Sequence, residues 1–288
     1  MKSLVFAVVV TALTLPGQQG SLEFEMVPFR KTVALRAKVG GQDGLFVFDT
    51  AGGLSQLSPK FAERIGCRPW GRSTGFQMMG QRLDMPQCND VQVELSGRKW
   101  TLPQTGVFDV MSLFPKDSPE AVDGLLALDL FAPNAITIDF PRKRLIIESQ
   151  ESLRARTARA TEFPARIARE AQGRALAVSI GVPTAQGKVW MEVDSGNGGT
   201  ILVSKTYATL FGLDPAKSGP QDADFPLGGA DMQVTGRAFT PDMIIDGNIG
   251  MPFLKEVVLT LDLPAGRLWL SRGEPATNNN GLRRGLPK

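Results

Sequence analysis

Apolar and polar residues alternate along two pairs of short segments, one pair in each half of the chain. Alternation with a period of two residues is typical of half-buried β-strands. Glycine or proline residues separate the members of each pair, as expected for a turn. The predicted strand pairs cover residues 33–39 with 45–48 and residues 176–180 with 188–193.

A short helix is predicted after each strand pair, at residues 59–65 and 205–211. Each predicted helix follows a serine, which is a favoured N-cap, and precedes a glycine, which is a common stop. The caps are Ser58 and Ser204, and the stops are Gly66 and Gly212. In the first half, further strands are predicted at residues 91–95 and 99–102.

A second repeat lies downstream, where residues 123–147 align with residues 246–270 without a gap. The matching pairs are Asp123 and Asp246, Gly124 and Gly247, Thr137 and Thr260, Asp139 and Asp262, Pro141 and Pro264, Arg144 and Arg267, and Leu145 and Leu268. A repeat of this period is far longer than a solenoid unit and indicates duplication of a domain. The predicted fold is mostly β, with two similar lobes related by a pseudo-two-fold axis and short helices.

These patterns divide the 288-residue chain into segments. Residues 21–149 and 173–272 are predicted to form an N-terminal and a C-terminal lobe. Residues 150–172 carry dispersed arginines and are interpreted as a solvated linker, with an anion site as the alternative. Residues 273–288 are polar and rich in glycine and asparagine, which predicts a flexible tail.

The first 20 residues have the features of a secretory signal peptide. Lys2 precedes an apolar run of about a dozen residues, which is followed by a small polar exit. The run is short for a membrane span, which needs about 20 residues. We therefore expect a periplasmic or secreted protein with no membrane span after signal removal, and an uncleaved anchor is the alternative.

The chain contains no histidine, which excludes Ser-His-Asp and Cys-His catalysis, histidine bases and histidine-ligated zinc. Two cysteines are too few for a four-cysteine zinc site, so no metal site and no cofactor are predicted. The net charge is only +3 with both signs mixed, so no nucleic-acid partner is expected. In an exported protein Cys67 and Cys88 are expected to form a disulfide, with two buried thiols as the alternative.

Two loops of similar sequence follow apolar strands, one in each half. Residues 49–53 read Asp-Thr-Ala-Gly-Gly, and residues 194–199 read Asp-Ser-Gly-Asn-Gly-Gly. An isolated Asp before a hydroxyl residue is commonly a turn residue. Because the motif occurs twice, we expect the two lobes to bring Asp49 and Asp194 together. Two such carboxyl groups can share one proton and activate a water molecule.

The ordered set of motifs resembles the retropepsin-like aspartic protease family, in its bacterial exported form with two lobes fused in one chain. The resemblance covers about residues 22–271 and implies acid-protease-like β-barrel lobes. It also implies a peptide or protein substrate, no cofactor, and a monomer that is an internal pseudo-dimer. Asp49 and Asp194 would be the catalytic dyad, and the supporting residues would be Thr50, Ala51, Ser195 and Gly196.

The first half departs from this family pattern at two positions. Ala51 and Ala127 stand where the family has glycine, whereas the second half has Gly196 and Gly250. If the backbone at Ala51 requires a positive φ, the methyl group costs about 1–2 kcal/mol. The two alanines are either an accommodated exchange or a sign of relaxed selection on catalysis.

A substrate-covering hairpin, or flap, is predicted within residues 71–80, which are rich in glycine and methionine. Residues 227–232 are its shorter counterpart. Ordinary loop and core packing is the alternative interpretation of both segments. The predicted substrate-binding residues are Gly75, Phe76, Met78, Met79, Gly228 and Gly229.

Three functions are compatible with these observations. The first is an exported aspartic endopeptidase that uses the Asp49/Asp194 dyad. The second is a catalytically impaired protein of the same fold that binds peptides or envelope components without cleavage. The third is an unrelated β-rich protein that binds carbohydrate or metal, suggested by the Asp-Gly-Asn sequence at residues 246–248.

Overall fold

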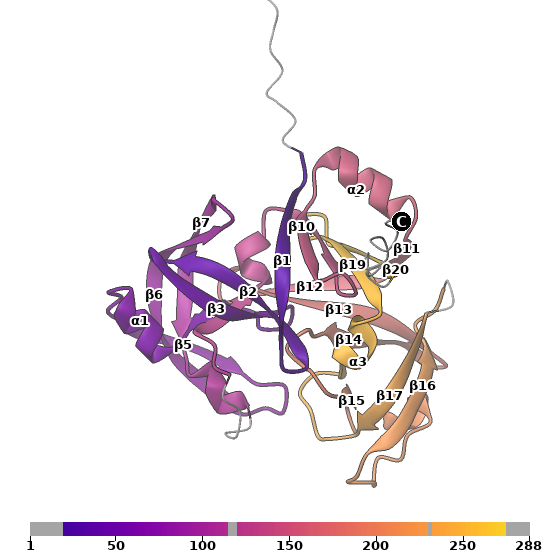
Figure 1. Ribbon diagram of the computed structural model, residues 1–288. Coiled ribbons are helices and arrows are strands. Elements are labelled where there is room, and N and C mark those ends of the chain that lie inside the picture. Colours follow the sequence, from indigo (N-terminus) through magenta and orange to yellow (C-terminus); the bar gives the residue numbers. More distant parts are fainter. Residues whose placement is uncertain (1–19, 115–119, 230–231, 275–288) are drawn as a thin grey trace, which may run out of the picture.

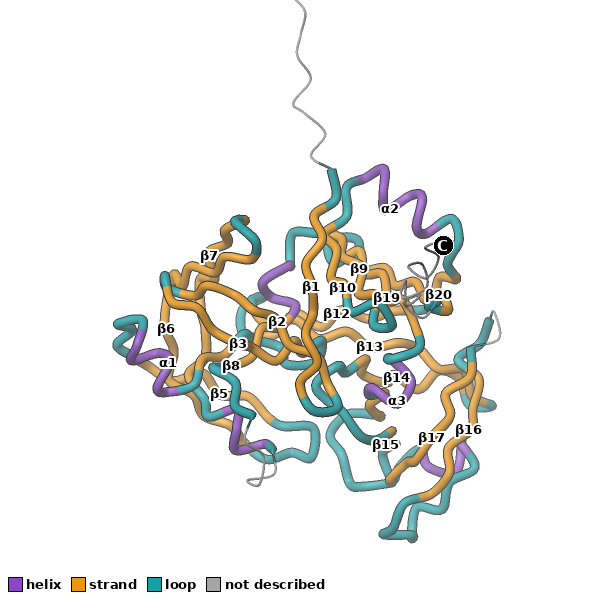
Figure 2. The backbone as a smooth tube through the Cα atoms, in the orientation of Figure 1, coloured by secondary structure: helices purple, strands orange, loops and turns teal. Residues whose placement is uncertain are grey.

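The computed structural model describes residues 20–114, 120–229 and 232–274. All but the last residue of the predicted signal peptide 1–20 and most of the predicted tail 273–288 therefore lie outside the described residues. Figure 1 shows two lobes on either side of a set of central strands, and Figure 2 shows that strands dominate both lobes. The prediction of a mostly β, two-lobed fold is confirmed.

The central strands come from both halves of the chain and belong to a 13-stranded sheet. They lie in the order β11-β20-β19-β9-β10-β1. Their bounds are β1 Leu22–Phe29, β9 Ala135–Asp139, β10 Arg144–Ile147, β11 Thr161–Phe163, β19 Val257–Asp262 and β20 Arg267–Arg272.

The first lobe continues the same sheet in the order β2-β3-β8-β4-β7-β6-β5. Its strands are β2 Thr32–Val39, β3 Gln42–Asp49, β4 Gln56–Leu57, β5 Trp70–Phe76, β6 Arg82–Leu95, β7 Arg98–Val107 and β8 Gly124–Ala127. Its helices are α1 Pro59–Arg64 and the 3₁₀ turns Val110–Leu113 and Leu128–Phe131.

The second lobe is a seven-stranded sheet in the order β12-β13-β14-β18-β15-β17-β16. Its strands are β12 Ala165–Glu170, β13 Ala175–Thr184, β14 Gly187–Val193, β15 Ile201–Val203, β16 Gln221–Pro226, β17 Gln233–Phe239 and β18 Gly247–Ile249. Its helices are the 3₁₀ turn Ala208–Phe211 and α3 Met251–Leu254.

The internal two-fold axis passes between β9 and β19, which pair antiparallel with Thr137 opposite Thr260. The two buried hydroxyl groups hydrogen-bond each other at 2.9 Å. Two further residues of the repeat also have matching roles. Oδ2 of Asp123 accepts a hydrogen bond from the Leu45 amide at 3.0 Å, and Oδ2 of Asp246 accepts one from the Trp190 amide at 2.9 Å. Residues that match in the sequence repeat therefore make equivalent contacts in the two halves.

The two predicted helices have different outcomes. Helix α1 begins as expected, because the Ser58 side chain accepts a hydrogen bond from the Phe61 amide. The helix predicted at 205–211 is only a 3₁₀ turn over Ala208–Phe211, and no side chain caps it. The Lys205 amide is bonded instead to the Pro241 carbonyl, which ties the start of the predicted helix to a neighbouring loop. Gly212 ends the turn with a φ of +69°.

The segment 150–172, interpreted as a solvated linker, contains regular structure. Helix α2 (Gln150–Thr157) begins with a capping box at Ser149 and has no buried residue, as expected for an exposed connector. Beyond it, β11 pairs with β20 and β12 pairs with β13. These strands extend both sheets, so the second part of this segment belongs to the sheets.

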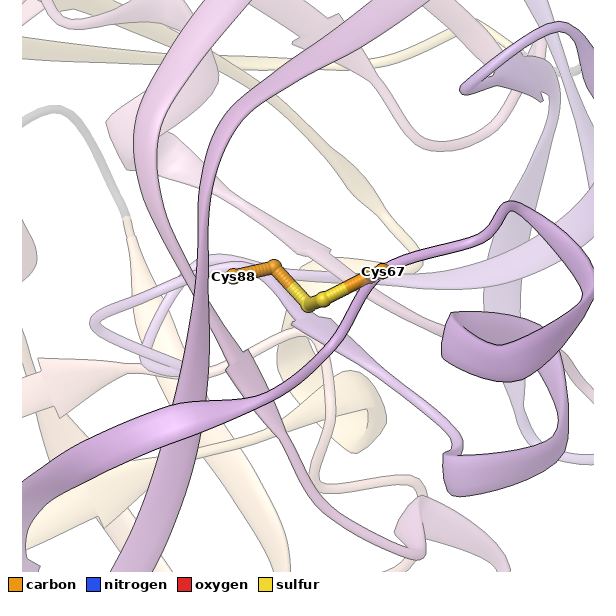
Figure 3. Close-up of a disulfide and its surroundings, with 2 residues drawn as sticks. All are labelled: Cys67 and Cys88. Atoms are coloured by element: carbon orange, nitrogen blue, oxygen red, sulfur yellow. A yellow bond between two sulfur atoms is a disulfide. The ribbon is translucent and has the colours of Figure 1, made fainter.

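The predicted disulfide is confirmed (Figure 3). Cys67 follows α1 and Cys88 lies on β6, and their Cα atoms are 6.1 Å apart. A disulfide of this kind persists in oxidising compartments, which fits an extracellular or secreted protein. Within the described ranges, no helix has the length and apolarity needed to cross a membrane.

Candidate active site

The two Asp loops begin where equivalent strands of the lobes end. Strand β3 ends at Asp49 and pairs in parallel with β8. Strand β14 ends at Val193, one residue before Asp194, and pairs in parallel with β18. Because the register is the same in both lobes, both loops leave their sheets in the same way, toward the junction of the lobes.

Four hydrogen bonds clamp the two loops together across the junction. The Thr50 amide donates to Oγ of Ser195 at 3.1 Å, and the Ser195 amide donates to Oγ1 of Thr50 at 3.0 Å. Each hydroxyl also donates to the strand of the other lobe, Thr50 to the Val193 carbonyl at 2.5 Å and Ser195 to the Phe48 carbonyl at 2.7 Å. Both hydroxyl residues are fully buried. The predicted supporting roles of Thr50 and Ser195 have a direct structural basis.

The carboxyl groups of Asp49 and Asp194 lie within hydrogen-bonding reach of each other. Asp194 is only 4% exposed, whereas Asp49 keeps somewhat more accessible surface. Burial, and then the charge of Asp194, raises the pKa of Asp49 well above its ordinary range. Such a pair cannot ionise fully near neutral pH and shares one proton.

The proton belongs on Asp49, because Asp194 is surrounded by hydrogen-bond donors. Oδ1 of Asp194 accepts from the amides of Gly196 at 2.8 Å and Asn197 at 3.0 Å. Oδ2 accepts from the Asn248 side-chain amide at 2.7 Å. Burial raises the pKa of Asp194, and these donors oppose that rise. Donors stabilise the ionised form of a carboxyl group, so Asp194 is the charged member.

The expectation that Ala51 strains the first loop is not met. Among the described residues with positive φ, the non-glycine members are Arg30, Asp90, Ser96, Lys143, Ala171 and Gln172. Ala51 is therefore in an ordinary conformation, and its amide donates to Oδ1 of Asp49 at 2.9 Å. The Gly196 amide makes the matching bond in the second lobe. Of the equivalent positions 51 and 196, only 196 requires glycine, because a Cβ atom there would lie 2.5 Å from Oδ2 of Asp49.

The second alanine, Ala127, is also accommodated. At the equivalent Gly250, a Cβ atom would lie 2.4 Å from the Asn197 carbonyl oxygen. The first loop has Gly52 at the position of Asn197, and Ala127 is buried without exposed surface. Its amide donates to Oγ of Ser55 at 3.0 Å. The first loop thus accommodates an alanine at position 127, as one of the two interpretations of the sequence allowed.

Sequence reasoning missed three polar residues near the loops. Asp129 accepts hydrogen bonds from the Ser55 amide and hydroxyl, and burial raises its pKa to about 6. Asn248 is completely buried beside Asp194. Glu192 is the strand partner of Asn248, and burial raises its pKa to about 7. A signal for two of them was present, because aligning the halves places Glu192 and Asn248 opposite apolar residues.

The predicted flap residues lie on the β5–β6 hairpin or in its turn. Gly75 and Phe76 end β5, and Phe76 is 63% exposed. Met78 and Met79 lie in the turn, where the Met78 carbonyl accepts a hydrogen bond from the Ile244 amide of the second lobe at 3.0 Å. The hairpin therefore reaches from the first lobe to the second.

The predicted counterpart of the flap does not reach the Asp loops. A Cβ atom at Gly228 would lie 2.8 Å from the Pro183 side chain, and one at Gly229 would lie 3.4 Å from the Thr161 side chain. Pro183 belongs to the end of the β13–β14 hairpin that is remote from Asp194. Gly228 and Gly229 therefore lie apart from Gly75, Phe76, Met78 and Met79.

Two cavities in the described part of the chain lie beside these elements. One has a volume of about 490 Å³ and is lined mainly by polar side chains around Trp70, Arg72 and Arg174. The other, of about 330 Å³, lies beside the disulfide. Neither is lined by Asp49 or Asp194. In residues 20–114, 120–229 and 232–274 no group of three or more His, Cys, Asp or Glu side chains is placed to hold a metal ion, and Asp246 accepts a hydrogen bond from the Trp190 amide.

Comparison with known proteins identifies the fold. No protein-family model and no curated protein sequence matches the chain. Basic 7S globulin from soybean is similar in structure, with a TM-score of 0.58, 10% identity, and coverage of 88% of this chain and 95% of that chain. Conglutin gamma, a basic 7S globulin from lupine seeds, gives the same values. The structure named edgp has a TM-score of 0.55 and 10% identity, and covers 90% of this chain and 96% of that chain.

These comparisons correct the family assignment made from the sequence. The chain has the two-lobed, pepsin-like fold of basic 7S globulins, and the assignment to the retropepsin-like bacterial proteases is wrong. The motifs misled because a carboxylate, a hydroxyl and glycine at a lobe junction belong to the shared fold. An identity of 10% shows the fold alone, so function has to be argued from the geometry of the site.

Proposed function

We propose that this protein binds an extended polypeptide segment at the Asp49–Asp194 pair, where the lobes meet, without efficient cleavage. The observation that carries this proposal is the saturation of Asp194. Its two oxygens accept hydrogen bonds from Gly196, Asn197 and Asn248, and Asp49 is a fourth partner. A carboxylate has about four acceptor positions, so Asp194 has none left for a water molecule that it would have to deprotonate.

The same geometry suits a ligand. The protonated Asp49 donates its one proton to Asp194, but its oxygens keep free acceptor positions for a peptide amide or hydroxyl group, and it keeps accessible surface. Strand β5 is the last strand of the 13-stranded sheet, so one of its edges has no strand partner within the described residues. An extended peptide can add its backbone to such an edge. The exposed Phe76 at the end of β5 offers an apolar contact.

Binding is tested by calorimetry with a short peptide that carries a central statine hydroxyl. We expect the wild-type protein to bind it, and Asp49→Asn or Asp194→Asn to weaken binding at least about tenfold, because either exchange removes the shared proton that holds the ligand-facing Asp49 against Asp194. Asp43→Asn is the matched control, since Asp43 is exposed at the opposite end of β3. Equal binding by all four proteins would exclude the carboxyl pair as the binding site.

Peptide hydrolysis is a second candidate, favoured by one observation. The cross-lobe hydrogen bonds of Thr50 and Ser195 hold Asp49 and Asp194 within reach of each other, which is the arrangement that a shared-proton mechanism requires. A time course of peptide cleavage followed by mass spectrometry between pH 3 and pH 8 distinguishes the candidates. Cleavage that Asp49→Asn abolishes would establish hydrolysis, and binding without cleavage would establish the first proposal.

A further inference from the structure

The two lobes differ at one pair of neighbouring positions. In the first lobe β3 and β8 place Val47 opposite Leu125, and both belong to a buried apolar cluster. In the second lobe β14 and β18 place Glu192 opposite Asn248 in the same register. Asp49 lies two positions after Val47, and Asp194 lies two positions after Glu192. The second lobe therefore has a polar pair, Glu192 and Asn248, at the position where the first lobe has the apolar pair Val47 and Leu125.

Asn248 connects Glu192 to the carboxyl pair. Its side-chain amide donates to Oδ2 of Asp194 at 2.7 Å, and as the register partner of Glu192 it lies beside that carboxyl group and lowers its pKa. Its carbonyl oxygen accepts from the Asn197 side chain at 2.8 Å, and Oδ1 of Asn197 in turn accepts from the Thr200 amide. These contacts fix the orientation of the Asn248 amide, because a flipped amide would place its NH₂ group against the NH₂ group of Asn197.

Several other groups surround Glu192. Asp194 on its own strand and Asp49 across the junction both interact electrostatically with it. Ser179 is its register partner on β13, and Glu170 on β12 is a further negative neighbour. Glu192 is half-buried, and burial, followed by the charge of Asp194, raises its pKa to about 7. The site therefore holds three interacting carboxyl groups, and only Asp194 is saturated with donors.

We propose that Glu192, acting together with Asn248, is a positioning residue that keeps the shared proton on Asp49 at and above neutral pH, where Glu192 itself is ionised. Ligand binding at the pair, which is the function proposed above, then extends to neutral pH. An ionised Glu192 adds negative charge beside Asp194 and makes loss of the Asp49 proton harder. Asn248 holds Asp194 as the charged member, so the proton cannot move there. The apolar pair Val47 and Leu125 can do neither.

The test is a ¹³C-carboxyl NMR titration of the ligand-free protein labelled at Asp and Glu. We expect Glu192→Gln to remove the step near pH 7 and to lower the midpoint of the Asp49 proton by about one pH unit, the size expected for removing one nearby partly screened charge. Glutamine keeps the shape of the side chain and can still accept from Asn248. Glu170→Gln is the matched control, because Glu170 carries the same charge on the same sheet without contacting Asn248, and it should leave the midpoint unchanged.

The outcomes separate this inference from the proposed function. A Glu192→Gln titration of Asp49 that superimposes on the wild type, or an equal shift in Glu170→Gln, would overturn the inference. If Glu192→Gln does not fold, the double variant Glu192→Val/Asn248→Leu reproduces the apolar pair, and persistence of the step near pH 7 in that variant would also overturn it. If Glu192→Gln shifts the Asp49 midpoint but the wild-type protein does not bind the statine peptide, the proposed function is wrong and the inference stands. A parallel shift in the pH dependence of statine binding would support both.

Discussion

The side-chain amide of Asn248 donates a hydrogen bond to Oδ2 of Asp194 at 2.7 Å, although the equivalent residue of the first lobe is Leu125. This contact makes the carboxyl pair asymmetric on a symmetric scaffold. Asp194 gains a donor that Asp49 does not have from the corresponding strand. This difference favours the charge on Asp194 and the proton on Asp49.

Glu192 and Asn248 are expected to behave as a unit in stability measurements. Asn248→Leu alone removes one donor of the buried Asp194 carboxylate and places an apolar side chain beside the half-buried Glu192, and should cost about 2–4 kcal/mol in unfolding free energy. The double variant Glu192→Val/Asn248→Leu should cost less than the sum of its single changes, because it restores an apolar pair. Urea unfolding of the four proteins at pH 7 measures this coupling, and strictly additive costs would show that the two side chains act independently.

The stability of the protein should fall as the pH rises from about 4 to about 7. Burial raises the pKa of Glu192 from 4.5 to about 7 and that of Asp129 from 3.8 to about 6. Between the ordinary and the raised pKa the unfolded state binds fewer protons than the folded state, so deprotonation favours unfolding. The stabilisation is complete below the ordinary pKa values and is lost through the raised ones.

Glu192→Gln isolates one part of this pH dependence. Because glutamine does not titrate, the variant should lose the part of the decline that lies between pH 4.5 and about 7, which amounts to at most about 3 kcal/mol. Denaturant unfolding at half-unit steps of pH gives both curves. A variant curve parallel to that of the wild type would mean that Glu192 keeps an ordinary pKa in the folded protein.

The cross-lobe clamp should contribute strongly to stability. Thr50→Val removes the acceptor of the Ser195 amide and the donor to the Val193 carbonyl, both of which are buried, and should cost about 2–4 kcal/mol. Thr101→Val is the control, because Thr101 is exposed on β7 and should change stability by less than about 0.5 kcal/mol. Similar costs for the two variants in thermal unfolding would show that the clamp adds little.

Residues 51 and 196 should respond in opposite ways to exchange of alanine and glycine. In Gly196→Ala the new methyl group would lie 2.5 Å from Oδ2 of Asp49, so we expect at least about tenfold weaker binding of the statine peptide. Ala51→Gly keeps the amide bond to Asp49 and relieves no strain, so its affinity should remain within about twofold of the wild type. A large gain from Ala51→Gly would mean that the alanine distorts the first loop.

The sequence was sufficient to predict the elements that depend on local pattern and on the repeat. Strands β2, β3, β13 and β14, the N-cap at Ser58, the disulfide and the two-lobed arrangement could all be derived from it. Strand β1 was missed, since it gains its place by pairing with both β2 and β10. Strand β11 was missed for the same reason, because its partner β20 is remote in sequence, whereas β12 was missed although it forms a hairpin with the next strand, β13.

The candidate site was predictable only where the two loops look alike. Asp49, Asp194, Thr50 and Ser195 lie in matching motifs, and the structure brings them together. Glu192 and Asn248 are far apart in sequence and become neighbours only through the parallel pairing of β14 and β18. The family assignment failed because these motifs mark a fold that proteins of different families share.

The most direct test of the account is to incubate the purified mature protein with a mixed peptide library at pH 7 and to identify the retained peptides by mass spectrometry. We predict intact peptides on the wild-type protein and on Asp43→Asn, and none on a variant that combines Asp49→Asn with Asp194→Asn. Retention by the double variant, no retention by the wild type, or rapid conversion of the library into fragments by the wild type alone would contradict it.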